Sequence, residues 1–249
     1  GDGEIDLDLA QPLVRQMIDR TGFAMAQQDV RYYLNGMYLE IKEGRLRFVA
    51  TDGHRLALCT APGQVAADDT SVIVPRKGVL ELSRLLDGDG SVALSVGSNH
   101  IRAATDQFTF TSKLVDGKFP EYERVLPRSP DKSVSGDRSE LRQAFTRTAI
   151  LSNEKYRGVR LSLTPGSLEI TANNPEQEQA EESVPVEYAG EALEVGFNVS
   201  YLLDVMGVLT GSTVRMSLSD SASSALIEEG EAGGDADAEA LYVVMPMRL

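Results

Sequence analysis

Several residue types are scarce in this chain, and each scarcity excludes a class of protein. Its 249 residues include a single cysteine, so no disulfide framework can form within the chain, and a reducing compartment is expected. Two histidines and one cysteine are too few for a structural zinc site. No apolar run approaches the roughly 18 residues of a membrane helix, and the N-terminal segment does not resemble a signal peptide. We therefore expect a cytoplasmic protein that does not enter a membrane.

The motifs of common catalytic sites are also missing. The sequence contains no Walker P-loop, no Gly-x-Gly-x-x-Gly motif and no EF-hand loop. Asp52 and His54 lie two positions apart and would share one face of a strand, so a Ser-His-Asp hydrolase is an alternative. No Gly-x-Ser-x-Gly segment supplies its nucleophile. The sequence therefore favours a binding protein without catalytic activity, cofactor or metal.

A loose internal repeat organises the chain, with an offset of 122 residues. The matched positions are Gly36 with Gly158, Gly44 with Gly166, Leu46 with Leu168, and Ala50 with Ala172. Alternation predicts paired strands over 37–50 and 159–172, and apolar periodicity predicts helices over 11–23, 77–86, 139–151 and 199–209. Further strands follow each second helix. We predict an α+β fold of tandem domains, each with two helices packed on antiparallel sheets.

The domain boundary is expected where prolines and turn-forming residues cluster, at Pro127 and the residues that follow it. This divides the chain into domains 1–127 and 128–249. Pro12 suits the first turn of a helix, and Asp137 or Ser139 suits a helix cap. Glycines after residues 86 and 209 predict left-handed helix ends. Residues 228–240 are acidic, rich in glycine and alanine, and have no apolar pattern, which predicts a mobile hairpin loop.

Eight segments carry a family resemblance. They are residues 28–37 (QDVRYYLNGM), 49–57 (VATDGHRLA), 74–78 (VPRKG), 111–120 (TSKLVDGKFP), 152–158 (SNEKYRG), 172–178 (ANNPEQE), 196–200 (GFNVS) and 242–249 (YVVMPMRL). Together, and in this order, they resemble the beta subunit of bacterial DNA polymerase III, the sliding clamp. The resemblance covers nearly the whole chain and implies a DNA-clamp fold. It also implies a non-enzymatic processivity factor for DNA replication and repair.

The resemblance extends to the second and third of the three domains in that family, so the first domain is expected to be absent. In the family, two subunits close a ring around double-stranded DNA without reading its sequence. A chain lacking the first domain lacks one partner surface of that ring, and we expect it to be mainly monomeric. A fragment and a natural short form that binds partner peptides without encircling DNA both stay open.

The resemblance also implies a cleft between the second and third domains that binds short peptides of polymerase subunits, the clamp loader and repair proteins. The matching residues are Leu34, Thr51, Gly53, His54, Arg55, Leu56, Pro120, Arg124, Val125, Ser224, Val243, Val244, Met245, Pro246, Met247 and Arg248. From the residues alone, 243–247 could equally be an ordinary last strand. Pro246 should end ladder pairing and leave Met247, an adaptable apolar side chain, to face a groove.

Basic residues recur on or beside three of the four predicted helices, although the net charge of the chain is −14. A local basic strip can still bind phosphates, because phosphates respond to the nearby charge. The DNA-binding candidates are Arg15, Arg20, Gln28, Tyr32, Tyr33, Arg76, Lys77, Arg84, Arg138, Arg142 and Arg147. Each could instead be simply a solvent-exposed helix residue. The resemblance assigns the subunit interface to Ile150, Leu151, Glu176, Glu178, Glu181 and Glu182.

Overall fold

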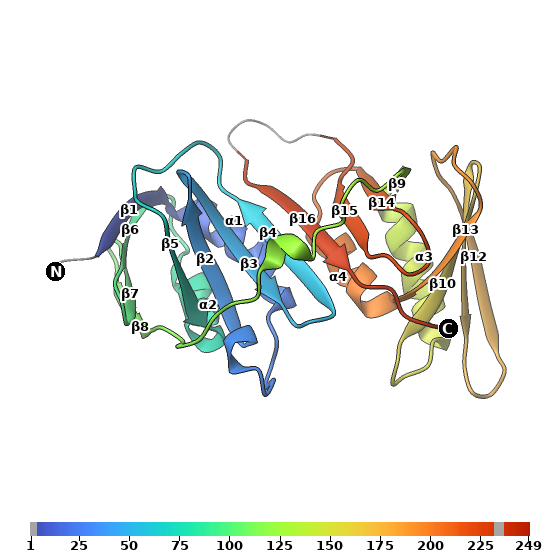
Figure 1. The fold of residues 1–249 in the computed structure, drawn as a ribbon, viewed down its shortest axis with the longest axis horizontal. Helices are drawn as coiled ribbons and strands as arrows, with labels where there is room; N and C mark the ends of the chain where they lie inside the picture. Colours follow the sequence, from blue (N-terminus) through green and yellow to red (C-terminus); the bar gives the residue numbers. More distant parts are fainter. Residues whose placement is uncertain (1–3, 232–236) are drawn as a thin grey trace. The chain divides into compact units, whose positions relative to one another are not determined.

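A computed structural model describes residues 4–231 and 237–249, which form two compact units (Figure 1). The first holds residues 4–122 and 237–240, and the second holds residues 123–231 and 241–249. The division falls between Tyr122 and Glu123, a few residues before the boundary proposed from the sequence at 127 and 128. Within the described ranges, no helix is both long and apolar enough to span a bilayer.

The first unit is built from antiparallel strands and the helices α1 (Gln11–Thr21) and α2 (Arg76–Leu85). Its strands are β1 (Ile5–Ala10), β2 (Gly36–Lys42), β3 (Arg45–Thr51), β4 (Arg55–Thr60), β5 (Thr70–Pro75), β6 (Ser91–Val96), β7 (His100–Ala104) and β8 (Thr109–Lys113). They pair in the orders β1-β6-β7-β8 and β5-β2-β3-β4. The two helices contact each other, and α1 packs on β3 and β4 while α2 packs on β2 and β5. Short 3-10 turns lie at η1 (Gly22–Ala24) and η2 (Tyr32–Leu34).

The second unit has the same construction around α3 (Arg138–Leu151) and α4 (Val199–Val208). Its strands are β9 (Lys132–Asp137), β10 (Gly158–Thr164), β11 (Ser167–Asn173), β12 (Gln179–Pro185), β13 (Leu193–Asn198), β14 (Thr213–Leu218), β15 (Ala225–Glu229) and the part of β16 (Glu239–Val244) from Leu241 onward. They pair in the orders β12-β11-β10-β13 and β16-β15-β14-β9. Helix α3 packs on α4 and on β11 and β12. A 3-10 turn, η3 (Tyr122–Arg124), lies where the units divide.

The internal repeat is confirmed as a structural repeat. Ten elements from β1 to β8 recur in the same order from β9 to β16. Adding 122 to the bounds of β2 (36 and 42) gives those of β10 (158 and 164), and the same shift relates β3 to β11 and β6 to β14. Strand order also repeats, because β5-β2-β3-β4 corresponds to β13-β10-β11-β12. The α+β class and the two helices of each repeat are therefore as predicted.

Local sequence explains how the helices begin. Pro12 lies in the first turn of α1, where its missing N–H costs no hydrogen bond. The Asp137 side chain caps α3 by accepting a hydrogen bond from the Glu140 amide at 2.9 Å. Asn198 caps α4 in the same way, accepting from the Ser200 amide at 2.8 Å. Of the two predicted caps for α3, Asp137 is thus the one used.

The predicted left-handed glycine ends are wrong. Neither Gly88 nor Gly211 is among the described glycines with positive φ. Arginine side chains from the neighbouring helix bind the carbonyl groups at these helix ends instead. Arg15 donates to the Leu86 carbonyl after α2, and Arg138 donates to the carbonyls of Met206 (3.2 Å) and Gly211 (2.8 Å) at the end of α4. Long-range hydrogen bonds thus replace the local glycine motif.

The predicted acidic loop over 228–240 is shorter than expected. Glu228 and Glu229 belong to β15, and Glu239 and Ala240 belong to β16. Arg215 of β14 pairs with Glu228 at 3.4 Å, so part of this acidic run is neutralised across strands. Residues 232–236 lie outside the described residues.

A polar cluster fixes the last residues of the first unit onto its sheet. The Tyr122 hydroxyl donates to the Glu40 carboxylate at 2.6 Å, and Arg47 donates to the Tyr122 oxygen at 3.2 Å. The Tyr38 ring stacks on Phe119, with centroids 4.5 Å apart and planes 3° apart. Burial, followed by the hydrogen bond to Glu40, raises the pKa of Tyr122 above its usual value. The segment after β8 is therefore attached to β2 by both polar and aromatic contacts.

We expect Tyr122→Phe to lower the free energy of unfolding by about 1 kcal/mol at pH 8, because the Glu40 carboxylate loses the hydrogen bond from the Tyr122 hydroxyl. A raised pKa in the folded state means that the tyrosine stabilises the fold fully below its unfolded pKa of about 10. Its contribution falls as the pH rises above that value. Urea unfolding at several pH values should show the difference between wild type and variant narrowing above about pH 10. A constant difference would contradict this assignment.

Candidate functional site

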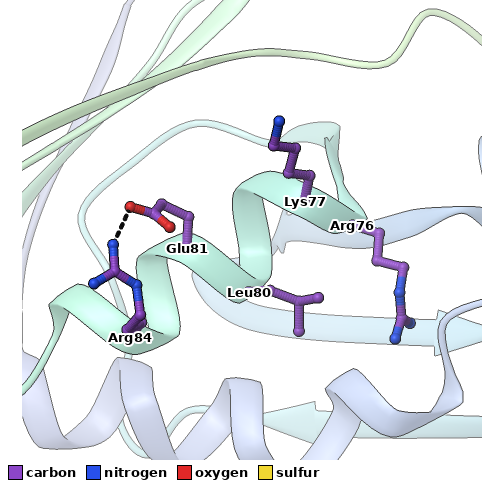
Figure 2. A pocket seen from close by; sticks show the side chains of 5 residues that line it. All are labelled: Arg76, Lys77, Leu80, Glu81 and Arg84. Carbon is purple, nitrogen blue, oxygen red and sulfur yellow. Dashed lines mark hydrogen bonds and ion pairs between the residues drawn. The ribbon is translucent and has the colours of Figure 1, made fainter.

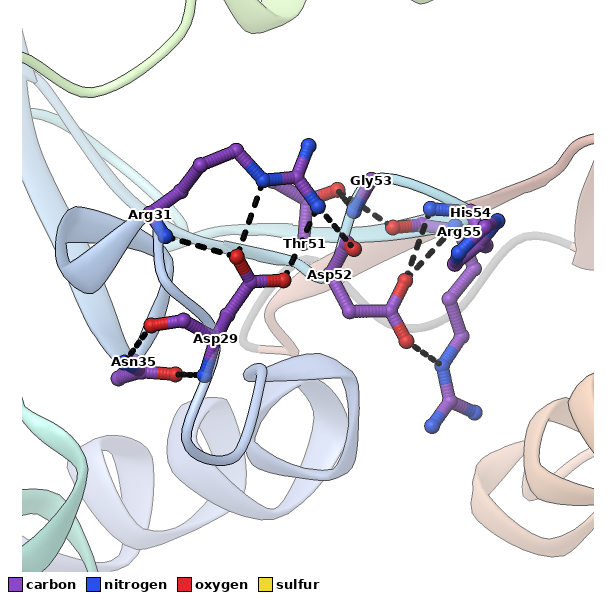
Figure 3. Close-up of polar contacts among 8 residues, drawn as sticks. All are labelled: Asp29, Arg31, Asn35, Thr51, Asp52, Gly53, His54 and Arg55. Atoms are coloured by element: carbon purple, nitrogen blue, oxygen red, sulfur yellow. Dashed lines mark hydrogen bonds and ion pairs between the residues drawn. The ribbon is translucent and has the colours of Figure 1, made fainter.

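Five predicted peptide-binding residues lie at or beside the turn between β3 and β4: Thr51, Gly53, His54, Arg55 and Leu56. Figure 3 shows the first four of them, together with Asp52. The Thr51 hydroxyl donates to the Arg55 carbonyl at 2.6 Å and accepts from the Gly53 amide at 3.1 Å. Gly53 has φ +91°, a conformation that side-chain-bearing residues rarely adopt. The turn is thus closed by its own hydrogen bonds and depends on glycine at position 53.

Asp52 organises this turn from within. One oxygen of its carboxylate accepts from the backbone amides of His54 (2.9 Å) and Arg55 (3.1 Å), and the other accepts from Arg55 Nε at 3.2 Å. The side chains of Arg55 and Asp52 are only 14% and 18% exposed. Asp52 and His54 lie in the turn between the two strands, and the Asp52 carboxylate accepts from the His54 backbone amide. The carboxylate of Asp52 thereby orients Arg55.

Arg55 extends this network to η1, the 3-10 turn that follows α1. Its guanidinium donates to the Phe23 carbonyl at 3.2 Å and lies 5.4 Å from the centre of the Phe23 ring. The Arg55 guanidinium is therefore held from two sides, through Nε by the Asp52 carboxylate and through Nη2 by the Phe23 carbonyl. An arginine held in one orientation is suited to hydrogen bonding with a ligand's polar groups.

A second loop, Asp29–Asn35, lies beside the turn (Figure 3). The Asp29 carboxylate accepts from Arg31 through its backbone amide (2.8 Å), Nε (3.0 Å) and Nη2 (3.0 Å). These hydrogen bonds hold the pKa of Asp29 below its ordinary value. Arg31 Nη2 also donates to the Asp52 carbonyl at 3.4 Å, and Asn35 bonds the Asp29 backbone through both ends of its amide at 3.0 Å. Arg31 thus links the loop to the turn.

The predicted peptide-binding residues of the second unit centre on the chain's last residues. Strand β16 ends at Val244, two residues before Pro246, which agrees with the proline ending the ladder. Met247 does not hang free, as the sequence suggested, because its amide donates to the Gly196 carbonyl at 2.8 Å. Met245 and Arg248 are exposed, and Pro246 is half-buried. The tail is therefore an ordered segment in which Met245 and Arg248 are exposed.

The remaining predicted peptide-binding residues differ in accessibility. Leu34, Leu56, Val243 and Val244 are fully buried, so in this structure they can only support a surface from beneath. His54, Pro120 and Arg124 are exposed, and Val125 and Ser224 are half-buried. The exposed members are therefore the ones whose side chains a ligand could reach directly.

Basic side chains line a shallow pocket along α2, with a volume of about 400 Å³ (Figure 2). Its lining residues are Arg76, Lys77, Leu80, Glu81 and Arg84. Arg84 pairs with Glu81 at 2.5 Å on an exposed surface, a pairing that raises the pKa of Arg84 and contributes little to stability. Arg76 donates to the Met25 carbonyl at 3.5 Å. Lys77 is exposed.

Several other DNA-binding candidates have structural contacts. Arg15 and Arg138 bind the ends of neighbouring helices, as described above. Arg147 pairs with Glu182 at 2.7 Å, which raises the pKa of Arg147. Arg20 donates to the Ala238 carbonyl, while Arg142 is exposed on α3. Arg15 and Arg138 therefore have a role that neither the DNA prediction nor the solvent-exposed alternative included, which is to bind the ends of the neighbouring helices.

The aromatic DNA candidates form a defined pair. The rings of Tyr32 and Tyr33 meet edge to face with centroids 5.8 Å apart, and the Tyr32 side chain is exposed. A side chain at Gly117 would lie 3.3 Å from both tyrosines, so this glycine lets the segment after β8 pass closely beside them. Gln28 is exposed and has φ +55°. A half-exposed pair of rings can stack on an unpaired base.

Comparison with protein families assigns the fold just described. Residues 8–121 match the central domain of the DNA polymerase III beta subunit, and residues 123–248 match its C-terminal domain. The chain belongs to this family.

Relatives of known name agree with the assignment. The chain is 63% identical to the beta sliding clamp of Pseudomonas aeruginosa over 251 aligned residues, and 56% identical to that of Escherichia coli K12 over 247. A crystal structure of the P. aeruginosa DNA polymerase sliding clamp with ligand superimposes with a TM-score of 0.96, covering 100% of this chain and 67% of that one. The alignments cover 100% and 99% of the chain and 67% and 66% of the two clamps. The chain thus spans about two thirds of the length of these clamps.

The interface candidates of this clamp-family chain lie at the end of α3 and along β12. Ile150 is 77% exposed, and Leu151 is half-buried. Glu176 and Glu178 lie in the exposed segment before β12, and Glu181 and Glu182 lie on β12 itself. Because Glu182 pairs with Arg147, one predicted interface residue already neutralises one predicted DNA-binding residue within the unit.

Sequence reasoning did not identify Arg31, Asp29 and Asn35 as partners of the β3–β4 turn. All three belong to the segment 28–37 that resembles clamps, and Asp29 is of a type that favours turns, because its side chain can accept from the backbone amide two residues later. No sequence signal showed that the loop meets residues 51–55. Reasoning from the sequence also considered Asp52 only as a catalytic candidate. In the structure, the Asp52 carboxylate positions the turn and Arg55.

Proposed function

We propose that this chain is a non-catalytic part of a bacterial sliding clamp that binds short peptide segments of replication and repair proteins in the cytoplasm. The main support is that the chain matches the central and C-terminal clamp domains over almost its full length. Support also comes from the fixed Arg55 in the first unit and from the ordered Met245–Arg248 tail in the second. An oriented guanidinium and adaptable methionine side chains are both groups that suit peptide binding.

For DNA, we propose sequence-independent contacts between phosphates and the exposed basic residues of α2 and α3. Lys77, Arg84 and Arg142 are the strongest candidates, because their side chains are exposed. Arg15 and Arg138 are assigned to helix-end binding instead. Mobile contacts to phosphates would let a clamp slide along DNA. The full ring with its first domain is the form expected to encircle DNA, and this chain alone is expected to be mainly monomeric.

A fluorescent peptide of the form Gln-Leu-x-Leu-Phe, titrated against the chain and followed by anisotropy, tests the peptide proposal. We expect saturable micromolar binding that Met247→Ala weakens by about tenfold, because the variant removes an apolar contact. Ile150→Ala is the matched control, because it truncates an exposed apolar residue that is not among the predicted peptide-binding residues. Absence of binding by the folded chain would contradict the proposal. Equal losses in both variants would also contradict it.

A further inference from the structure

In both repeats, the segment that follows the last strand crosses a neighbouring strand and makes one backbone hydrogen bond to it. In the first unit, the Val115 amide donates to the Ile73 carbonyl of β5 at 2.9 Å. In the second, the Met247 amide donates to the Gly196 carbonyl of β13 at 2.8 Å. Ile73 pairs with Tyr38, and Gly196 pairs with Arg160, which is Tyr38 shifted by 122 residues. The two crossings therefore occupy the same position of the repeat.

The residue beneath the crossing differs between the repeats. The first has Ile73, whereas the second has Gly196. A Cβ on Gly196 would lie 2.6 Å from the Met247 carbonyl oxygen and 2.7 Å from Leu249 Cγ. Real side chains do not tolerate such distances, so the tail passes closer to β13 than any other residue type would allow.

A second glycine, Gly158, extends the part of the sheet surface that has no side chains. Gly158 of β10 pairs with Asn198, two residues from Gly196, and therefore lies on the same face of the sheet. A Cβ on Gly158 would lie 2.6 Å from Leu249 Cδ2 and 3.3 Å from Met247 Sδ. The side chains of Met247 and Leu249 thus occupy the space that two ordinary residues would fill.

We propose that Gly158 and Gly196 are positioning residues, forming a side-chain-free seat that holds Met247 and Leu249 and thereby sets the peptide-binding tail. The tail is attached at Val244, which pairs with Ala225, and again at Met247. Only Met245 and Pro246 lie between the two attachments. The inference rests on the proposed peptide-binding function, which it deepens by naming the residues that order the tail.

The two glycines differ in how an added methyl group can be accommodated. At position 158 the closest atom is the end of the flexible Leu249 side chain, which can rotate away. At position 196 the closest atom is the backbone oxygen of Met247, which cannot move without releasing the tail. Gly158→Ala should therefore be rescued by shortening Leu249, and Gly196→Ala should not.

The experiment is a double-mutant cycle in which Gly158→Ala and Gly196→Ala are each made with and without Leu249→Ala. Gly207→Ala is the control, because a Cβ at that position meets open space. The readouts are peptide affinity by anisotropy and amide hydrogen exchange of Met247 by NMR, with the melting temperature as a check on folding. We expect Gly196→Ala to weaken peptide binding by about tenfold and to speed Met247 exchange in both backgrounds. Gly158→Ala should weaken binding only when Leu249 is present.

The outcomes separate this inference from the proposed function. If the rate of amide hydrogen exchange at Met247 is unchanged in a folded Gly196→Ala variant, the proposed glycine seat is wrong. Equal effects of Gly158→Ala in both backgrounds would also overturn it. If the wild-type chain binds no peptide while Gly196→Ala still speeds Met247 exchange, the seat stands as an anchor for the tail and the peptide proposal falls. Faster exchange without weaker binding, in a chain that binds peptide, would overturn the positioning role.

Discussion

Replacing Asp52 by alanine is expected to lower the free energy of unfolding by about 2–3 kcal/mol and to weaken peptide binding by about tenfold or more. The variant removes the acceptor of two backbone amides and leaves the largely buried Arg55 guanidinium without its carboxylate. Arg55 would then lose the orientation that the proposed peptide site requires. Chemical denaturation and peptide anisotropy on the same preparations measure the two effects.

Asp29→Ala is the matched control for this variant. Asp29 also accepts from a backbone amide two residues later and from an arginine side chain. Its partner Arg31 is 47% exposed, so water replaces the lost contact more readily. We therefore expect a clearly smaller loss of stability for Asp29→Ala. A loss as large as that of Asp52→Ala would show that burial of Arg55 does not determine the effect.

Replacing Phe145 by alanine is expected to cost about 3–5 kcal/mol of stability, the largest effect of any change considered. Phe145 lies on the inner face of α3 and is fully buried, so its removal leaves a cavity in the core of the second unit. Urea unfolding followed by circular dichroism measures the loss. The control is Ile150→Ala on the same helix, which truncates a residue that is 77% exposed and should change stability little. A similar loss in both variants would contradict the core assignment.

The sequence alone determined the repeat, the four helices and the α+β class. These follow from local patterns: apolar residues at helical spacing, alternation along strands, and caps such as Asp137 that act within three residues of the helix start. The match of glycines at a constant offset sufficed to show that one unit occurs twice. The candidate site residues came from the family resemblance. Short motifs assigned them, since no periodic pattern in the sequence marks a binding site.

Only the tertiary structure decided what several of these residues do. Helix ends are bound by Arg15 and Arg138, residues that were read as DNA contacts, because their side chains reach carbonyls about 70 positions away in the sequence. Asp52, which the sequence suggested only as part of an alternative hydrolase site, orients Arg55. Gly196 supports the tail through a contact 51 residues along the chain. Such roles depend on which side chains and backbone groups come into contact after folding. Periodicity and spacing in a sequence do not show contacts between residues so far apart along the chain.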